Sequence, residues 1–96
     1  MAELLTLDRF RPAVGEPFVV CDDRVDGLAL VLAEARSLGP GYADREAFAL
    51  LFHGPREPLL PQATYRLANE RVGEHDIFIV PVGRTADGLE YEAIFT

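Results

Sequence analysis

Apolar and polar residues alternate along most of the chain from Pro17 onward, and this period of two is typical of β-strands with one face in a core. Six segments show the pattern and are predicted to be strands: residues 18–21, 28–36, 48–53, 64–68, 77–82 and 90–95. Segment 77–82 is the clearest, because it is apolar throughout and mostly β-branched or aromatic. The residues predicted to face inward in the later strands are Phe48, Leu50, Phe52, Tyr65, Leu67, Tyr91, Ala93 and Phe95.

The start of the chain has a different period. Residues 3–14 are predicted to form a helix, because their apolar side chains recur at helical spacing. These side chains are Leu4, Leu7, Phe10 and Val14. Pro12 predicts that the helix is short and ends near Arg11. Its apolar stripe is expected to cover one open end of a sheet.

Segment 28–36 supports two interpretations. Its Leu, Ala, Glu and Arg residues favour a helix, but Asp26-Gly27 is predicted to be a hairpin turn that leads directly into a strand. Gly and Pro mark further turns or loops at residues 38–44, 54–61, 69–73 and 83–88. The pattern predicts one all-β domain over residues 1–96, with a small α+β fold as the alternative. About six antiparallel strands are expected to form a small barrel or sandwich with one short N-terminal helix.

The composition narrows the possible partners. The chain is 49% hydrophobic and 26% charged, which is typical of a folded globular protein. Its net charge is −7, from 16 acidic residues against 9 arginines and no lysine, so we expect neither nucleic acid nor a membrane as partner. No apolar run is long enough for a membrane span, and the first residues lack the basic start of a signal peptide. A cytoplasmic location is therefore expected.

The residues that most often carry chemistry do not form a known pattern. Cys21 is the single cysteine, which excludes an internal disulfide, and the two aspartates after it disfavour a reactive thiolate. His53 and His75 are separated by a spacing that matches no metal motif. The acidic segment 22–26 lacks the distal glutamate of a calcium loop. We expect no catalytic, cofactor or metal site, and a protein that is not an enzyme.

Glu90 and Glu92 are predicted to share one face of the last strand, about 7 Å apart at the rise of a strand. Glycosidases use paired carboxylates at such a separation, but they hold the pair in a cleft of a larger scaffold. An ion pair with an arginine of a neighbouring strand is the simpler interpretation. Arg66 is the predicted partner.

Four motifs stand out in the second half of the chain, namely FALLFHGP at residues 48–55, LPQATYRL at 60–67, IFIVPVG at 77–83 and DGLEYEAIF at 87–95. Together with the opening LTLDRFRPAVG at 5–15, they resemble a family of short bacterial proteins classed only as a domain of unknown function. The resemblance implies an association with phage-tail-like proteins. It implies no catalytic residue.

The segment between the third and fourth strands is the predicted protein-binding site. It is rich in proline and therefore stiff, and it carries two leucines in a connection that should be exposed. The predicted contact residues are Pro55, Arg56, Pro58, Leu59, Leu60 and Pro61. The alternative is that one leucine folds back to fill the end of the barrel.

The function expected from these observations is a non-enzymatic interaction or accessory module of a phage-tail-like assembly. Its partner would be another protein or a second copy of the chain, joined through the edge strand of an open barrel. The alternative is a small-ligand-binding β-barrel whose mouth is lined by Tyr42, Tyr65 or Tyr91. Side chains are expected to fill most of the interior of so small a barrel.

Overall fold

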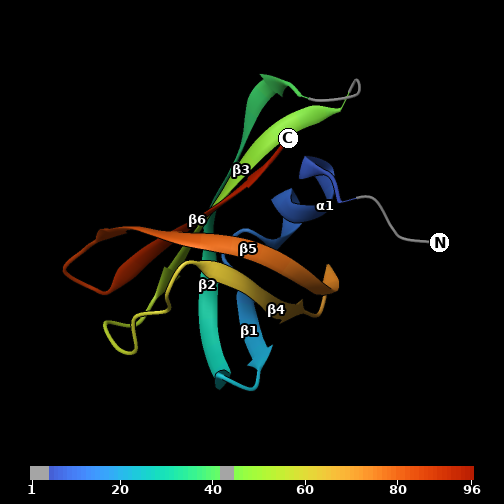
Figure 1. The fold of residues 1–96 in the computed structure, drawn as a ribbon. Coiled ribbons are helices and arrows are strands. Elements are labelled where there is room, and N and C mark those ends of the chain that lie inside the picture. Colours follow the sequence, from blue (N-terminus) through green and yellow to red (C-terminus); the bar gives the residue numbers. More distant parts are fainter. Residues whose placement is uncertain (1–4, 42–44) are drawn as a thin grey trace.

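The chain folds into six antiparallel strands in one ring-like sheet with a short helix at one end (Figure 1). The computed structural model describes residues 5–41 and 45–96. The strands are β1 (Pro17–Asp22), β2 (Val25–Pro40), β3 (Glu46–Gly54), β4 (Ala63–Asn69), β5 (Gly73–Arg84) and β6 (Leu89–Phe95). The predicted all-β fold with one short N-terminal helix is confirmed.

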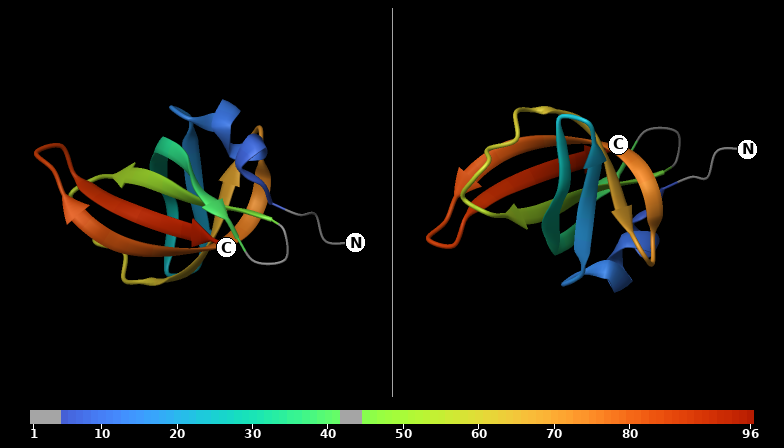
Figure 2. Two further views of the ribbon diagram at one scale, coloured as in Figure 1. Left: turned by 90° about the horizontal axis from the view of Figure 1, so that it is seen from above. Right: turned by 90° about the horizontal axis from the view of Figure 1, so that it is seen from below.

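The strands neighbour one another in the order β1-β2-β3-β6-β5-β4, and β4 returns to β1. Two long strands make this possible, because β2 pairs with β1 through its first half and with β3 through its second. In the same way β5 pairs with β4 and then with β6. Figure 2 shows the resulting ring from above and below. The predicted open barrel is wrong, since the ring closes between β1 and β4.

One cluster of buried side chains occupies the interior of the ring. The predicted inward positions of β3, β4 and β6 are confirmed, except that Phe95 at the end of β6 is only half-buried. The largest fully buried side chains are Phe10, Phe18, Phe48, Phe52, Tyr65 and Tyr91. At about 25 cal/mol per Å² of apolar surface, burial of these rings is the main source of stability in so small a domain.

The helix α1 (Leu7–Phe10) covers one end of the ring, and a 3₁₀ turn, η1 (Arg11–Ala13), follows it. The ring of Phe10 is completely buried, with its centroid 5.8 Å from those of Phe48 and Phe95. The helix is shorter than the predicted 3–14, because Pro12 cannot donate a hydrogen bond within an α-helix and the chain tightens into a 3₁₀ turn. Leu4 lies outside the described residues. None of the helices in the described chain has the length and apolar character needed to cross a membrane.

The turn between β1 and β2 differs from the prediction. It lies at residues 23–24, while Asp26 and Gly27 already belong to β2. Gly27 adopts a φ of 85° where β2 bulges opposite β1, a conformation that suits glycine. Strand β2 also continues to Pro40, so the predicted loop at 38–44 begins too early, and the helical alternative for 28–36 is wrong.

Two backbones meet at the opposite end of the ring, where β3 ends and β6 begins. A Cβ atom added to Gly88 would collide with the backbone carbonyl oxygen of Gly54. Gly88 lies at the base of the turn between β5 and β6, which spans residues 85–88 rather than the predicted 83–88, since β5 continues to Arg84. Backbone hydrogen bonds between Thr85 and Gly88 close this turn. Glycine is therefore required at position 88 by contact rather than by φ.

We expect Phe10→Ala to lower the free energy of unfolding by about 3–5 kcal/mol, because it removes the ring that closes the core. Urea unfolding of the purified variant measures this loss. Arg11→Ala is the matched control, since the neighbouring Arg11 side chain is 56% exposed. Equal stability of the Phe10→Ala variant and the wild type would contradict the role assigned to α1.

Candidate functional site

The proline-rich loop between β3 and β4 contains the predicted contact residues, and five of the six are exposed. These five are Pro55, Arg56, Pro58, Leu59 and Pro61. Leu59 is the apolar tip, with 55% of its surface exposed. Leu60 is completely buried, so one leucine folds back into the core, as the alternative interpretation had it. The protein-binding prediction therefore rests on the five exposed residues.

Three hydrogen bonds hold this loop against the ring. The Arg56 guanidinium donates to the carbonyl oxygen of Ala86 in the β5–β6 turn. The backbone N–H of Leu60 donates to the buried Tyr91 hydroxyl at 3.0 Å. The Tyr65 hydroxyl donates to the carbonyl oxygen of Pro61 at 2.7 Å. The loop is thus fixed at several points rather than anchored only at its ends.

The outer side of β5 is a second candidate surface, and none of the residues predicted to bind a partner lies on it. Phe78 and Val82 point outward with 51% and 50% of their surfaces exposed, and Val80 between them is partly exposed. Val80 pairs with Glu92 of β6, and the outward residue that follows Glu92 along β6 is Ile94, which is 51% exposed. We call Phe78, Val80, Val82 and Ile94 the β5 face.

The sequence did carry a signal for this surface. Segment 77–82 is apolar at every position, and a strand of that kind is usually covered on both faces. Here Ile77 and Ile79 are buried on the inner side, whereas in Figure 1 no other element lies over the middle of β5. The outward side chains of this segment are therefore not covered by another element of the described chain.

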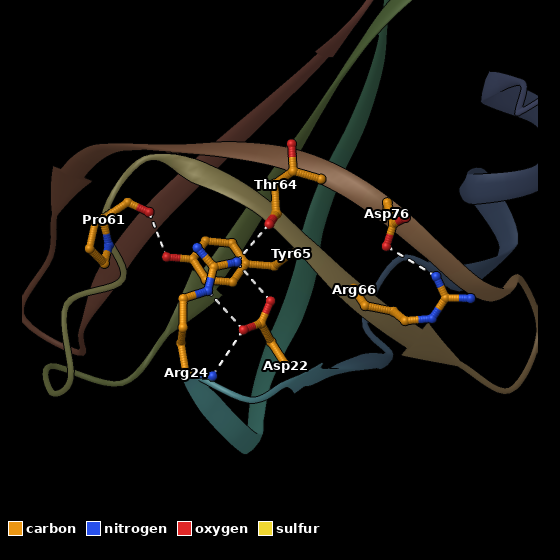
Figure 3. Close-up of polar contacts among 7 residues, drawn as sticks. All are labelled: Asp22, Arg24, Pro61, Thr64, Tyr65, Arg66 and Asp76. Carbon is orange, nitrogen blue, oxygen red and sulfur yellow. Dashed lines mark hydrogen bonds and ion pairs between the residues drawn. The ribbon is translucent and has the colours of Figure 1, made fainter.

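Charged side chains surround the β5 face. Glu92 lies 3.5 Å from Arg36, and Glu90 lies 3.1 Å from His53. The predicted pairing of these glutamates with Arg66 is wrong, because β6 lies between β3 and β5 and does not touch β4. Arg66 instead pairs across the β4–β5 ladder with Asp76 (Figure 3). It also lies 3.6 Å from Glu74. Surface pairs of this kind contribute little stability.

A polar cluster joins the β1–β2 turn to β4 (Figure 3). Asp22 accepts hydrogen bonds from the Arg24 backbone N–H and from two nitrogens of its guanidinium, at 2.7–3.0 Å. The same guanidinium donates to the carbonyl oxygen of Thr64 at 2.8 Å and lies 4.4 Å from the centre of the Tyr65 ring. The hydrogen bonds from the Arg24 side chain and backbone lower the pKa of the Asp22 carboxyl to about 2.

A second cluster lies at the other end of β1. Glu16 accepts two hydrogen bonds from the guanidinium of Arg71, at 2.8 and 3.0 Å, and one from the Asn69 amide. These bonds, first those of Arg71 and then that of Asn69, lower the pKa of the Glu16 carboxyl. The side-chain oxygen Oδ1 of Asn69 in turn accepts hydrogen bonds from the backbone N–H groups of Arg71 and Val72. In both clusters the polar groups therefore form hydrogen bonds with one another, and these bonds connect β1 with the β4–β5 hairpin.

The two histidines lie apart in the fold. His53 of β3 contacts Glu90, whereas the His75 ring lies 2.9 Å from the carbonyl oxygen of Val72. Among the described residues, no group of three or more His, Cys, Asp or Glu side chains is arranged to hold a metal ion. The Cys21 thiol is half-buried and lies 3.7 Å from the carbonyl oxygen of Val19.

Hollows are found on the surface of the ring. One of about 500 Å³ lies beside α1, lined by Leu7, Phe48 and Phe95 among others. Another of about 510 Å³ lies beside Glu16 and Arg71. Tyr65 and Tyr91, expected at the mouth of a ligand-binding barrel, are buried in the core instead. Tyr42 lies outside the described residues.

The family resemblance is confirmed by comparison with known proteins. The model of a family described as a domain of unknown function, DUF6916, matches residues 5–95, and the chain therefore belongs to that family. Searches of curated proteins and of solved structures found no match.

We expect the Asp22 cluster to make stability depend on pH. The pKa of Asp22 is about 2 in the folded chain and near 3.8 when unfolded, so its contribution is complete above about pH 4 and is lost as the pH falls through about 2. Asp22→Asn should be less stable than the wild type at neutral pH, and the difference should shrink as the pH falls through this range.

Urea unfolding at a series of pH values measures this effect. Asp23→Asn is the matched control, because Asp23 is exposed in the same turn and should leave the pH dependence unchanged. If the two variants behaved alike, the cluster would have no measurable role in closing the ring.

Proposed function

We propose that this DUF6916 protein is a non-enzymatic protein-binding module, and that the β5 face is its contact surface. The observation that carries the proposal is the exposed outer side of residues 77–82 in β5, a segment that is apolar throughout. Phe78, Val82 and Ile94 each leave about half of their surface in water. Covering these exposed parts would contribute roughly 2 kcal/mol per residue at 25 cal/mol per Å².

The composition of the β5 face also suits a protein partner. Aromatic side chains that lie at the centre of an apolar patch often dominate binding energy, while charged pairs at the rim exclude water and set specificity. Phe78 is the aromatic side chain of the β5 face and would be its main contact residue. The pairs Arg36–Glu92 and His53–Glu90 would form part of the rim.

That the module is not an enzyme belongs to the same proposal. It is supported by what the polar clusters do, since Asp22, Arg24, Glu16 and Arg71 bond to one another and to backbone groups of neighbouring strands. The family resemblance makes a larger protein of a phage-tail-like assembly the first partner to test.

A small-ligand-binding barrel is the alternative function. The interior of the ring is occupied by core side chains, so a ligand would have to bind at a surface hollow such as the one beside α1. That hollow exceeds the roughly 300 Å³ typical of small-molecule sites. Ile94 of the β5 face also lines that hollow, but Phe78, Val80 and Val82 do not, so a substitution at Phe78 tests the β5 face separately.

We expect Phe78→Asp to weaken binding of the partner about tenfold or more, because it removes the aromatic side chain and places a charge in an apolar contact. The tagged wild-type and variant chains are used to capture proteins from the source lysate, and the affinity of the retained partner is then measured by calorimetry. The variant should remain folded, since Phe78 is outside the core.

Leu59→Asp is the matched comparison, because Leu59 is as exposed as Phe78 but lies in the proline-rich loop. Binding that survives Leu59→Asp and is lost with Phe78→Asp supports the β5 face. The reverse result would assign the contact to the loop. No retained protein at all would count against a binding module under the growth conditions used.

A further inference from the structure

The second half of β2 has one free edge. Leu32 is the last residue whose edge is occupied, since its N–H donates to Glu16 O and its carbonyl accepts from Gly15 N. Beyond it, residues 34–37 pair with β3 on one side, between bulges at Ala33 and Leu38, and no strand of the described chain pairs with them on the other. In Figure 1 this half of β2 projects with β3 beyond the ring. Unpaired backbone groups of this kind can accept another strand.

The side chains along this edge are small or charged, in the order Ala33, Glu34, Ala35, Arg36 and Ser37. Glu34 and Arg36 point outward and are 55% and 53% exposed, and they lie 3.6 Å apart in a loose pair. The alternating residues Ala35 and Ser37 share the other side of the strand with Leu50 and Phe48. No bulky side chain therefore blocks the approach of a second strand.

We propose that this edge pairs antiparallel with the same edge of a second copy of the chain. A two-fold axis at Ala35 places Glu34 of each copy opposite Arg36 of the other, so two reciprocal ion pairs form across the new ladder. The same register places Ala33 opposite Ser37, which are both small. Leu38 of each copy then reaches the level of Leu32 of the other, beside the exposed Val14.

Charge complementarity is what selects a second copy here. A like-charged pair directly opposite on two strands is unfavourable, and only the two-fold register centred on Ala35 places Glu34 and Arg36 opposite each other. The net charge of −7 on each copy opposes association at long range. At physiological salt that repulsion is screened over about 8 Å, whereas opposite side chains on paired strands lie about 5 Å apart.

Charged side chains on an edge strand can also prevent two monomers from pairing. The following experiment distinguishes this role from the proposed pairing of two copies. Sedimentation velocity over a concentration series should show a monomer–dimer equilibrium for the wild type. Glu34→Arg and Arg36→Glu should each weaken the dimer about tenfold or more, because each brings like charges opposite one another. The combined Glu34→Arg/Arg36→Glu variant should restore it.

A mixture gives the sharpest test. Neither single variant should pair with itself, yet the Glu34→Arg chain and the Arg36→Glu chain should form a one-to-one dimer, because every charge then faces its opposite. Glu57→Arg and Arg84→Glu are controls with the same changes in net charge at exposed positions away from this edge. They should leave the wild-type equilibrium within about threefold.

Two results would overturn the inference. One is a wild-type chain that stays monomeric over the whole series, and the other is a dimer that both single variants leave unchanged. Arg36 belongs both to this edge and to the rim proposed for the β5 face. The two proposals are separated by Phe78→Asp, which should leave this dimer intact. A dimer lost with Phe78→Asp but kept in Glu34→Arg would assign self-association to the β5 face and would also overturn the edge pairing.

Discussion

The fold depends on how β1 meets β4, because this seam turns a sheet with two edges into a ring. The strands share only two residue pairs there, Val19 with Ala68 and Val20 with Leu67. Polar clusters lie beyond both ends of this short ladder, one built on Glu16 and one on Asp22. Each uses an arginine whose planar group can bond a carboxylate through two nitrogens at once. Arginine at these places therefore has a geometric role that lysine could not fill.

The alternation of apolar residues was sufficient to predict six strands and their inward sides, since one face of each strand has to leave water. The ends of the strands could not be predicted from this alternation. Asp22 accepts from the backbone N–H of Arg24, and this local bond places the β1–β2 turn earlier than Asp26-Gly27. Strand β2 runs on through Gly39 and Pro40 because two bulges absorb its irregular residues while it keeps β3 as partner. Contacts of this kind depend on the neighbouring strand and have no local signature.

The candidate surface was less predictable than the fold for a related reason. A run such as residues 77–82 shows that both sides of a strand are apolar, but only the strand order shows which side has a cover. The prediction that Arg66 pairs with Glu90 or Glu92 was wrong for the same reason, since only the strand order shows that β4 and β6 are not neighbours. In the proline-rich loop, the sequence could not show which of two adjacent leucines would enter the core. The hydrogen bond from Leu60 N to Tyr91, which accompanies its burial, joins residues 31 positions apart.

The contact between Gly88 and Gly54 limits how the molecule can change in evolution. At the base of the β5–β6 hairpin two backbones touch, so no side chain can be accommodated at position 88 without moving a strand. Ala86 and Asp87, at the tip, are exposed and meet no such limit. New length or new chemistry can therefore accumulate at the tip while the base stays fixed. The hairpin is a place where this small domain can diversify without rebuilding its core.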